Sequence, residues 1–305
     1  MADKIEDQVF ALHQDLIRGH YRHGYYQSFF LCDPKKRHIH KAPVRDRLLH
    51  HAIHRLLVPI FDPTFIFDSY SSRHGKGLHK GLNRFQELAW CLSRNNTRVV
   101  WVLKCDIKKF FDSIDHIVLQ KLLRAKIKDE RALELMVEVV SSFEKKPGQG
   151  VPLGNLTSQL FANIYLNQLD HFVKRQLRVK NYLRYADDFV VLSRDQKELK
   201  LILLKINCFL NQKLLLQLHQ RKVTIYEWHN GIDFLGYVLF PNYRILRTKT
   251  KRRMLKKLEG ESQVMQAGKI DFADLNQSVQ SYFGLLKHCR GREIKLKIKK
   301  LLPLV

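Results

Sequence analysis

The chain has 305 residues, of which 45% are hydrophobic and 27% charged, with 18 Phe, 11 Tyr and 3 Trp; it can therefore build a sizeable core, which excludes a disordered tail protein. Its 54 Lys and Arg outnumber 29 Asp and Glu and give a formal net charge of +25. Because the basic residues are spread over the whole length, this excess indicates a long basic groove for a polyanion such as nucleic acid.

Cysteine usage and hydropathy suggest an intracellular protein. The cysteines form no Cys-x-x-Cys pair and no zinc pattern, so we expect reduced thiols. The first ten residues carry acidic side chains and lack the apolar core of a signal peptide. The most apolar later stretch, residues 201–218, is interrupted by two lysines and two asparagines. We therefore expect a cytoplasmic protein that does not bind membranes.

The first hundred residues are predicted to be mostly helical. Residues 44–61 place apolar side chains three and four apart, and Pro59 and Pro63 mark the end of that segment. A loop rich in Ser, Gly and basic residues follows at 69–77. The run 99–106 is almost continuously apolar, which is typical of a strand buried on both faces, and it ends at Asp106.

The remainder alternates helical and strand patterns before it becomes helical and basic. Residues 116–143 have helical spacing, 151–177 are predicted to be a loop that leads into a long helix, and 181–193 have the pattern of a hairpin. We expect a helix at about 197–216, short strands at 223–226 and 231–240, and, in a separate small lobe, basic helices at about 249–259, 272–288 and 292–302.

Three carboxylates stand at the ends of these apolar runs. Asp187 and Asp188 lie at the tip of the predicted hairpin, where Asp is common for conformational reasons alone. Two adjacent charges between buried strands are nevertheless costly without a cation. If the strand that ends at Asp106 is a neighbour of the hairpin, all three carboxylates meet. Such a cluster suits two Mg²⁺ ions about 4 Å apart.

The local sequence at this hairpin resembles a known catalytic motif. Tyr-Ala-Asp-Asp at 185–188 is similar to the Tyr-x-Asp-Asp motif of reverse transcriptases, and other segments resemble that family in the expected order. The resemblance implies that Asp106, Asp187 and Asp188 are catalytic and hold two Mg²⁺ ions, with Mn²⁺ as a substitute. It also implies that the carbonyl of Ile107 is a metal ligand.

The resemblance further implies residues that bind the incoming dNTP. Residues 35–53 resemble the fingers segment that holds the triphosphate, with Arg37 as the best match and Lys35 or Lys36 as weaker ones. Phe111 falls where the family excludes the ribose 2′-hydroxyl, and Lys222 where a lysine lies near the leaving pyrophosphate. A surface charge at Arg37 and a core aromatic at Phe111 are the plainer alternatives.

Contacts to template and primer are implied at other segments. Residues 69–77 resemble a template-contacting segment, and Phe-Leu-Gly-Tyr at 234–237 resembles a primer-gripping hairpin. The residues expected to bind template or primer are Arg45, Arg47, Arg73, His74, Lys76, Tyr185, Leu235 and Gly236.

The expected fold is the α+β fold of a right-hand polymerase, in which helices cover an antiparallel palm sheet. The fingers would comprise 1–103 and 116–150, the palm 104–115 and 151–246, and a small helical thumb 247–305.

One departure from the family pattern points to a subtype. Intron-type bacterial enzymes usually read Pro-Gln-Gly and then Ser-Pro, whereas this chain has Leu153 before Gly154, and Gln159 in place of the proline. The resemblance implies that Leu153, Gly154 and Gln159 bind the incoming dNTP. This sequence is similar to the corresponding segment in reverse transcriptases of diversity-generating retroelements, which bacteria and phages encode. They copy a template RNA with errors at adenines. Leucine offers the nascent pair no hydrogen bond, which would loosen selection for correct geometry. Alternatively, Leu153 only packs under its loop.

Other interpretations remain open. A retron-type enzyme should carry a Val-Thr-Gly near its end, which is absent here, and an intron maturase would need further sequence after the thumb. An antiphage-defence reverse transcriptase is a further alternative. A non-catalytic RNA-binding module conflicts with three clustered carboxylates, which would repel RNA without a metal. The resemblance implies template RNA, primer or cDNA, and dNTPs as partners, together with a basic or RNA-binding accessory protein.

Overall fold

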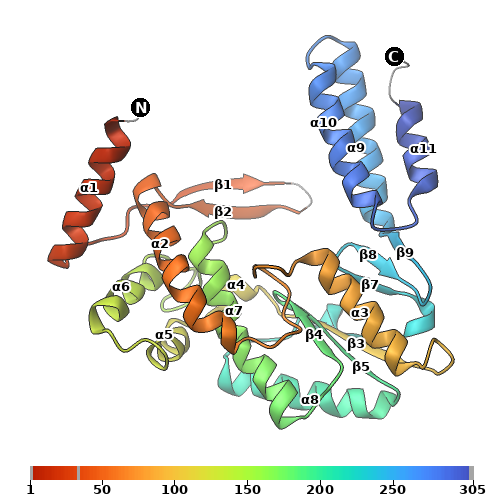
Figure 1. Cartoon of the computed structure of the whole chain (residues 1–305), viewed down its shortest axis with the longest axis horizontal. Coiled ribbons are helices and arrows are strands. Elements are labelled where there is room, and N and C mark those ends of the chain that lie inside the picture. The colour runs from red at the N-terminus through yellow and green to blue at the C-terminus, as the bar shows by residue number, and fades with distance from the viewer. Residues whose placement is uncertain (1–2, 33–34, 302–305) are drawn as a thin grey trace. The chain divides into compact units, whose positions relative to one another are not determined.

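The computed structural model describes residues 3–32 and 35–301, which form two compact units (Figure 1). The first unit contains residues up to 77, 103–191 and 197–224, and the second contains 78–102, 192–196 and the chain from 225 onward. The proposed limits of fingers, palm and thumb stay a prediction. No helix in the described part of the chain is long and apolar enough to span a bilayer.

The N-terminal part of the first unit combines helices with a two-stranded ribbon. Helix α1 (Asp3–Arg18) precedes strands β1 (Gln27–Leu31) and β2 (Arg37–Lys41), which pair antiparallel. The mostly helical expectation missed this ribbon, because every residue of β1 is exposed and the strand has no apolar and polar alternation. Helix α2 (Val44–Phe61) confirms the helix expected there, and the short helix η1 (Asp62–Thr64) follows it.

A four-stranded sheet has the strand order β4-β5-β3-β6. Strands β4 (Tyr182–Tyr185) and β5 (Asp188–Ser193) form the predicted hairpin and pair antiparallel. Strand β3 (Trp101–Asp106) is the predicted strand that ends at Asp106, and β6 (Thr224–Glu227) lies at the sheet edge. The last five residues of β5 are buried, as expected for a core strand. The expected mixture of helices and antiparallel strands is confirmed.

Helices of the first unit supply the rest of its core. Helix α7 (Leu156–His171) is buried on most sides, contacts α2 and α5, and continues into a π-helical turn, η2 (Phe172–Gln176). The segment 116–143, predicted to be helical, forms two helices, α5 (His116–Arg124) and α6 (Glu130–Ser141). Asp129 begins the second by accepting from the amide of Ala132. The other helices are the short α4 (Phe110–Ser113), the long α8 (Gln196–Lys213) and the short η3 (Gln220–Lys222).

The second unit contains its own sheet and a helical bundle. Helix α3 (Leu78–Leu92) packs Phe85 edge-on against buried Trp228, which belongs to the short helix η4 (Trp228–Asn230). Strands β7 (Ile232–Phe234), β8 (Tyr237–Leu239) and β9 (Arg244–Leu246) form a sheet in chain order. Strand β9 was not expected.

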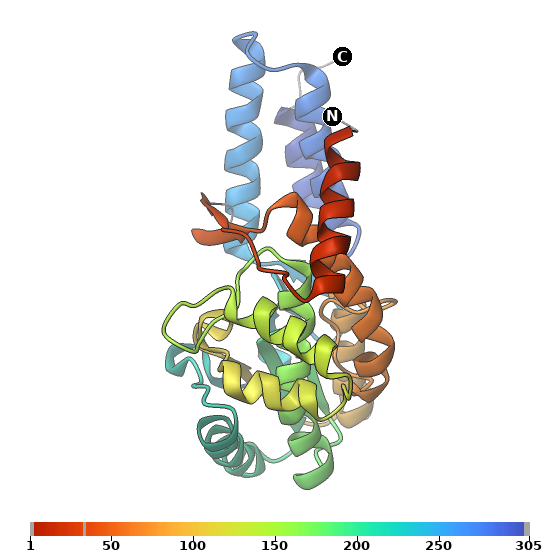
Figure 2. The ribbon, with the colours of Figure 1, turned by 90° about the vertical axis from the view of Figure 1, so that its left-hand side faces the viewer.

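The bundle consists of α9 (Thr248–Gln266), α10 (Phe272–Leu286) and α11 (Arg292–Leu301), which pack against one another (Figures 1 and 2). Three helices were expected, but α9 is longer than the predicted 249–259. Gly260 did not end it, because a glycine inside a helix costs only about 1 kcal/mol relative to alanine.

Candidate active site

The tip of the β4–β5 hairpin holds the two adjacent aspartates. Because Tyr185 pairs with Asp188, Ala186 and Asp187 form a two-residue turn. Ala186 has a φ of +52°, a left-handed conformation that costs a residue with a Cβ about 1–2 kcal/mol. The amide of Ile107 donates to the carbonyl of Asp187 at 3.3 Å. This bond places the turn beside the end of β3, which carries Asp106.

The three carboxylates influence one another electrostatically. Burial, followed by the charge of Asp187, raises the pKa of Asp188 to about 6, and Asp106 adds to this rise. Burial also raises the pKa of Asp187, again with a contribution from Asp106. Strands β3 and β5 are neighbours in the sheet, so the charges of the three carboxylates act on one another, and their joint binding of a metal stays a prediction. Neighbouring Lys222 and Arg37 act in the opposite direction on Asp187.

Lys222 is held directly on the first of these carboxylates. Its Nζ donates to Asp106 Oδ1 at 2.6 Å. The segment that carries Lys222 is fixed to the end of β3 by two backbone bonds: the amide of His219 donates to the carbonyl of Asp106, and that of Lys108 to the carbonyl of Gln217. An ammonium therefore already compensates part of the negative charge.

The donor set suits a hard cation, although the carboxylates are not arranged around one. Among residues 3–32 and 35–301, no group of three His, Cys, Asp or Glu side chains is gathered closely enough to hold a metal. Carboxylate oxygens are nevertheless the ligands that Mg²⁺ prefers, and burial makes their charges costly without a cation. Asp106, Asp187 and Asp188 therefore fit Mg²⁺ chemically. The role of the Ile107 carbonyl stays a prediction.

The residues expected around the nucleotide include a loop attached to β2. The amide of His40 donates to the carbonyl of Leu153 at 2.9 Å, and Asn155 Nδ2 donates to the carbonyl of His40 at 2.9 Å. Gly154 has a φ of +111°, and a Cβ there would lie 2.8 Å from Cγ2 of Ile39. The Leu153–Gly154 backbone is thus fixed against the ribbon.

Phe111 is hydrogen-bonded to the same loop. Its carbonyl accepts from the amide of Val151 at 2.9 Å, and its half-buried ring packs edge-on against Phe110. Gln159, in the first turn of α7, is exposed, as are Lys35, Lys36 and Arg37. The structure therefore brings Phe111, Leu153 and Gly154 into one neighbourhood, and their nucleotide contacts stay predictions.

Several residues expected to bind template or primer are engaged within the protein. Arg73 pairs with Asp62 at 2.7 Å, and Arg45 pairs with Asp15. Lys76 Nζ donates to the carbonyl of Phe67 at 2.8 Å and lies over its ring. His74 is exposed, and Arg47 and Tyr185 are half-buried. Leu235 and Gly236, in the second unit, form a hairpin turn with φ of +48° and +89°, as a type I′ turn requires. Their nucleic-acid contacts remain predictions.

Sequence reasoning missed the residues that support the turn from inside the fold. Arg184 precedes the motif by one residue and is fully buried, paired with Asp170 of α7. Asn155 was also missed; its side chain joins the loop that carries Leu153 and Gly154 to β2. A charged residue inside the apolar strand Tyr182–Tyr185 was the available signal for Arg184, because buried charge requires a partner.

Comparisons with known proteins agree with this geometry. Residues 33–239 match the family model described as reverse transcriptase (RNA-dependent DNA polymerase). The chain is 26% identical to protein YkfC of Escherichia coli over 75% of this chain and 70% of that protein. It is 25% identical to the group II intron-encoded protein LtrA of Lactococcus lactis, over 77% of this chain and 47% of that protein. The fold is similar to apo telomerase from Candida tropicalis, with a TM-score of 0.57 at 13% identity, covering 79% of this chain and 52% of that one.

Proposed function

Because this chain belongs to the reverse transcriptase family of RNA-dependent DNA polymerases, we propose that it copies a template RNA into cDNA at the site formed by Asp106, Asp187 and Asp188. The observation that carries this proposal is the electrostatic coupling of the three carboxylates. Asp187 and Asp188 are half-buried and have raised pKa values, and Asp106, which is buried, is paired with Lys222. Structural stability alone would not favour such an arrangement, since buried like charges are costly.

The three aspartates would hold two Mg²⁺ ions, which supply charge neutralisation and polarise the reacting phosphate. Lys222, which donates to Asp106, would be the residue whose ammonium meets the leaving pyrophosphate if Mg²⁺ were held by that carboxylate. Arg37, exposed at the start of β2 and electrostatically coupled to Asp187, would meet the triphosphate. Phe111 would stack against the sugar and exclude a 2′-hydroxyl.

We further propose that the enzyme is of the diversity-generating retroelement type and makes errors at template adenines. Leu153 supports this proposal, because its backbone is fixed against β2 while its half-buried side chain offers no polar group to a nascent pair. A wall without polar groups selects by shape alone. Gly154 and Gln159 would border the same pocket.

The similarity to an intron-encoded protein favours a second candidate, an intron-type reverse transcriptase. The two candidates share the active site and differ in template and fidelity. Sequenced cDNA separates them, because errors concentrated at adenines belong to the first candidate only.

The proposed partners follow from charge and chemistry. A net charge of +25 suits a template RNA paired with primer or cDNA, while dNTPs are the substrates. Phosphate contacts of this kind are blind to base sequence, so template choice would require RNA structure or a basic or RNA-binding accessory protein.

The test of the proposed function is primer extension on an RNA template with dNTPs and Mg²⁺. Asp187→Asn removes a ligand charge without changing side-chain size, and we expect extension to fall by several orders of magnitude. Asp195→Asn makes the same chemical change at an exposed position after β5 and should retain wild-type activity. Undiminished extension by Asp187→Asn would refute the assignment.

A further inference from the structure

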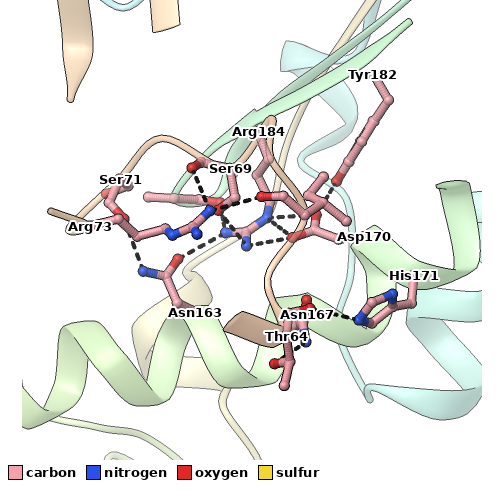
Figure 3. Close-up of polar contacts among 12 residues, drawn as sticks. Thr64, Ser69, Ser71, Arg73, Asn163, Asn167, Asp170, His171, Tyr182 and Arg184 are labelled. Carbon is pink, nitrogen blue, oxygen red and sulfur yellow. Dashed lines mark hydrogen bonds and ion pairs between the residues drawn. The ribbon is translucent and has the colours of Figure 1, made fainter. Parts of the chain in front are cut away.

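The guanidinium of Arg184 is buried directly behind the proposed catalytic turn, and Figure 3 shows the side chains around it. Each of its five N–H groups has an acceptor. Nε and Nη2 donate to the carboxylate of Asp170, with the shortest distance 2.7 Å. Nη2 also donates to Ser69 Oγ at 3.1 Å. Nη1 donates to Asn163 Oδ1 at 3.2 Å and to the carbonyl of Ala186 at 3.1 Å.

The ion pair within this network is completely enclosed. The side chains of Arg184 and Asp170 are both 0% exposed, and the hydroxyl of Tyr182 donates to Asp170 Oδ1 at 2.7 Å. Burial, and then the charge of Asp170, raises the pKa of Tyr182 well above 10, so that this hydroxyl remains a donor. Enclosed ion pairs are weak evidence for stability, because desolvation offsets their attraction, and fixing one geometry is a better attested use.

One of the fixed groups is the carbonyl of Ala186, inside the turn itself. Ala186 adopts its left-handed φ of +52° immediately before Asp187. Residues in such conformations persist only where surrounding contacts over-determine them. The bond from Arg184 Nη1 supplies such a contact and restrains the peptide that joins Ala186 to Asp187.

The other side of the network is a loop segment, residues 68–73. The amide of Arg184 donates to the carbonyl of Asp68, and the carbonyl of Arg184 accepts from the amide of Tyr70, both at 2.9 Å. Asn163 Nδ2 donates to the carbonyl of Ser71 at 2.9 Å, while its Oδ1 accepts from Arg184. Main-chain and side-chain bonds therefore tie the 68–73 segment and the turn to the same residue.

We propose that Arg184 is a positioning residue that fixes the turn carrying Asp187 and Asp188 relative to the 68–73 segment. Displacement of that segment is then transmitted to the carboxylates through the main chain of Arg184, and through Asn163 and the guanidinium. This proposal rests on the proposed function, in which the segment lies against the template. The aspartates would be in place for chemistry only when the segment is.

Helix α7 offers a matched pair of variants for the test. Asn163 and Asn167 lie one helical turn apart and are 3% and 6% exposed. Asn163 bonds to Ser71 and Arg184, whereas Asn167 Nδ2 donates to Thr64 Oγ1 at 3.2 Å, outside the network (Figure 3). Asn163→Ala and Asn167→Ala therefore remove the same group from the same helix, but only the first removes bonds between the 68–73 segment and the guanidinium. The main-chain bonds from Arg184 to Asp68 and Tyr70 remain in both variants.

The first measurement is steady-state primer extension, with Tm and the Kd for template and primer measured alongside. A positioning role predicts that the two variants lose similar amounts of Tm and keep similar Kd values, while kcat falls roughly 10- to 100-fold in Asn163→Ala alone. Equal loss of kcat in both variants would overturn the proposal, because a structural role predicts that result. Arg184→Lys, which keeps the charge but loses the planar fork, should lower kcat as Asn163→Ala does.

The second measurement is amide hydrogen exchange without substrate. We expect Asn163→Ala to accelerate exchange in residues 68–73 and 184–188 together, and Asn167→Ala to accelerate neither segment. Faster exchange in residues 68–73 without faster exchange in residues 184–188 would overturn the proposed coupling between the two segments. Because exchange needs no activity, it separates this proposal from the proposed function: a wild-type chain that extends no primer would refute only the latter.

Discussion

Lys222 Nζ lies 2.6 Å from Asp106 Oδ1, although the two residues are 116 positions apart in the chain. The lysine is partly exposed, while the side chain of Asp106 is 11% exposed. An ammonium thus occupies a carboxylate that the proposed chemistry assigns to a metal ion. The two cations would compete for it.

This competition predicts the behaviour of Lys222→Gln. Without the ammonium, Asp106 should bind Mg²⁺ more readily, so that the Mg²⁺ concentration for half-maximal extension falls several-fold. At saturating Mg²⁺, kcat should fall roughly 10- to 100-fold, because the charge proposed to meet the pyrophosphate is lost. Titrating Mg²⁺ in primer extension measures both effects. Lys200→Gln, exposed on α8, is the control and should change neither. A higher Mg²⁺ requirement in Lys222→Gln would contradict the competition.

Phe111→Ala tests exclusion of ribonucleotides. The ring is half-buried, so its removal should cost some stability while leaving the loop attached through the backbone bond from Val151. If the ring excludes the 2′-hydroxyl, the ratio of kcat/KM for rNTPs to that for dNTPs rises by at least about tenfold, since one steric clash is worth more than about 1.4 kcal/mol. An unchanged ratio would assign Phe111 to the core alone.

Leu153→Gln tests the origin of low fidelity. An amide at this position can hydrogen-bond a correctly shaped pair, and a bond worth about 1 kcal/mol should reduce misincorporation about fivefold. Template adenines should change most. Sequencing cDNA from wild type and variant on one RNA containing all four bases, at matched dNTP concentrations, gives both spectra. Leu153→Met, which keeps an apolar side chain of similar volume, should behave as wild type. Identical spectra for wild type and Leu153→Gln would remove Leu153 from the explanation.

Stability should depend on pH through His50. Burial, then the charge of His23, lowers its pKa from 6.5 to about 4, although neighbouring Asp46 acts in the opposite direction and His51 adds a small decrease. Between pH 6.5 and about 4 the unfolded chain binds the proton that the folded chain refuses, so stability falls as the pH falls through this range. The loss is on the order of 2–3 kcal/mol.

The measurement is urea unfolding at pH 7.5 and pH 4.5 for wild type and His50→Gln. Carboxylates titrate in both proteins, so the difference between them isolates the histidine. We expect the variant to lose less stability than wild type on acidification. Equal losses would mean that His50 titrates normally in the folded chain.

The parts of the fold that could be predicted are those whose burial has a simple period. Strand β3 and the β4–β5 hairpin are mostly apolar, and α2 has apolar side chains three and four apart. The ribbon of β1 and β2 could not be predicted, because it is exposed and its stability comes from pairing.

The proposed catalytic turn could be located from the local sequence at 185–188, but the residues that hold it in place could not be identified in this way. Asp187 and Asp188 stand next to each other in the sequence. Lys222 and Asp106 are 116 positions apart, and Arg184 and Ser69 are 115 apart, while Asp170 precedes Arg184 by 14 positions. From sequence alone, a charged residue is expected to lie at the surface. Its burial can be inferred only when its partner is known, and only the folded chain identifies that partner.

The close approach of Gly154 to Ile39 has a consequence for how this pocket can evolve. Any side chain at 154 would meet both a left-handed backbone and a neighbouring methyl group, so substitution there should displace the ribbon and be selected against. Its neighbour Leu153 engages β2 through its carbonyl, which every amino acid possesses. In a saturation library, position 154 should therefore be almost invariant while 153 tolerates many residues. If Leu153 sets accuracy as proposed, accuracy could change over generations without a change in the backbone around it.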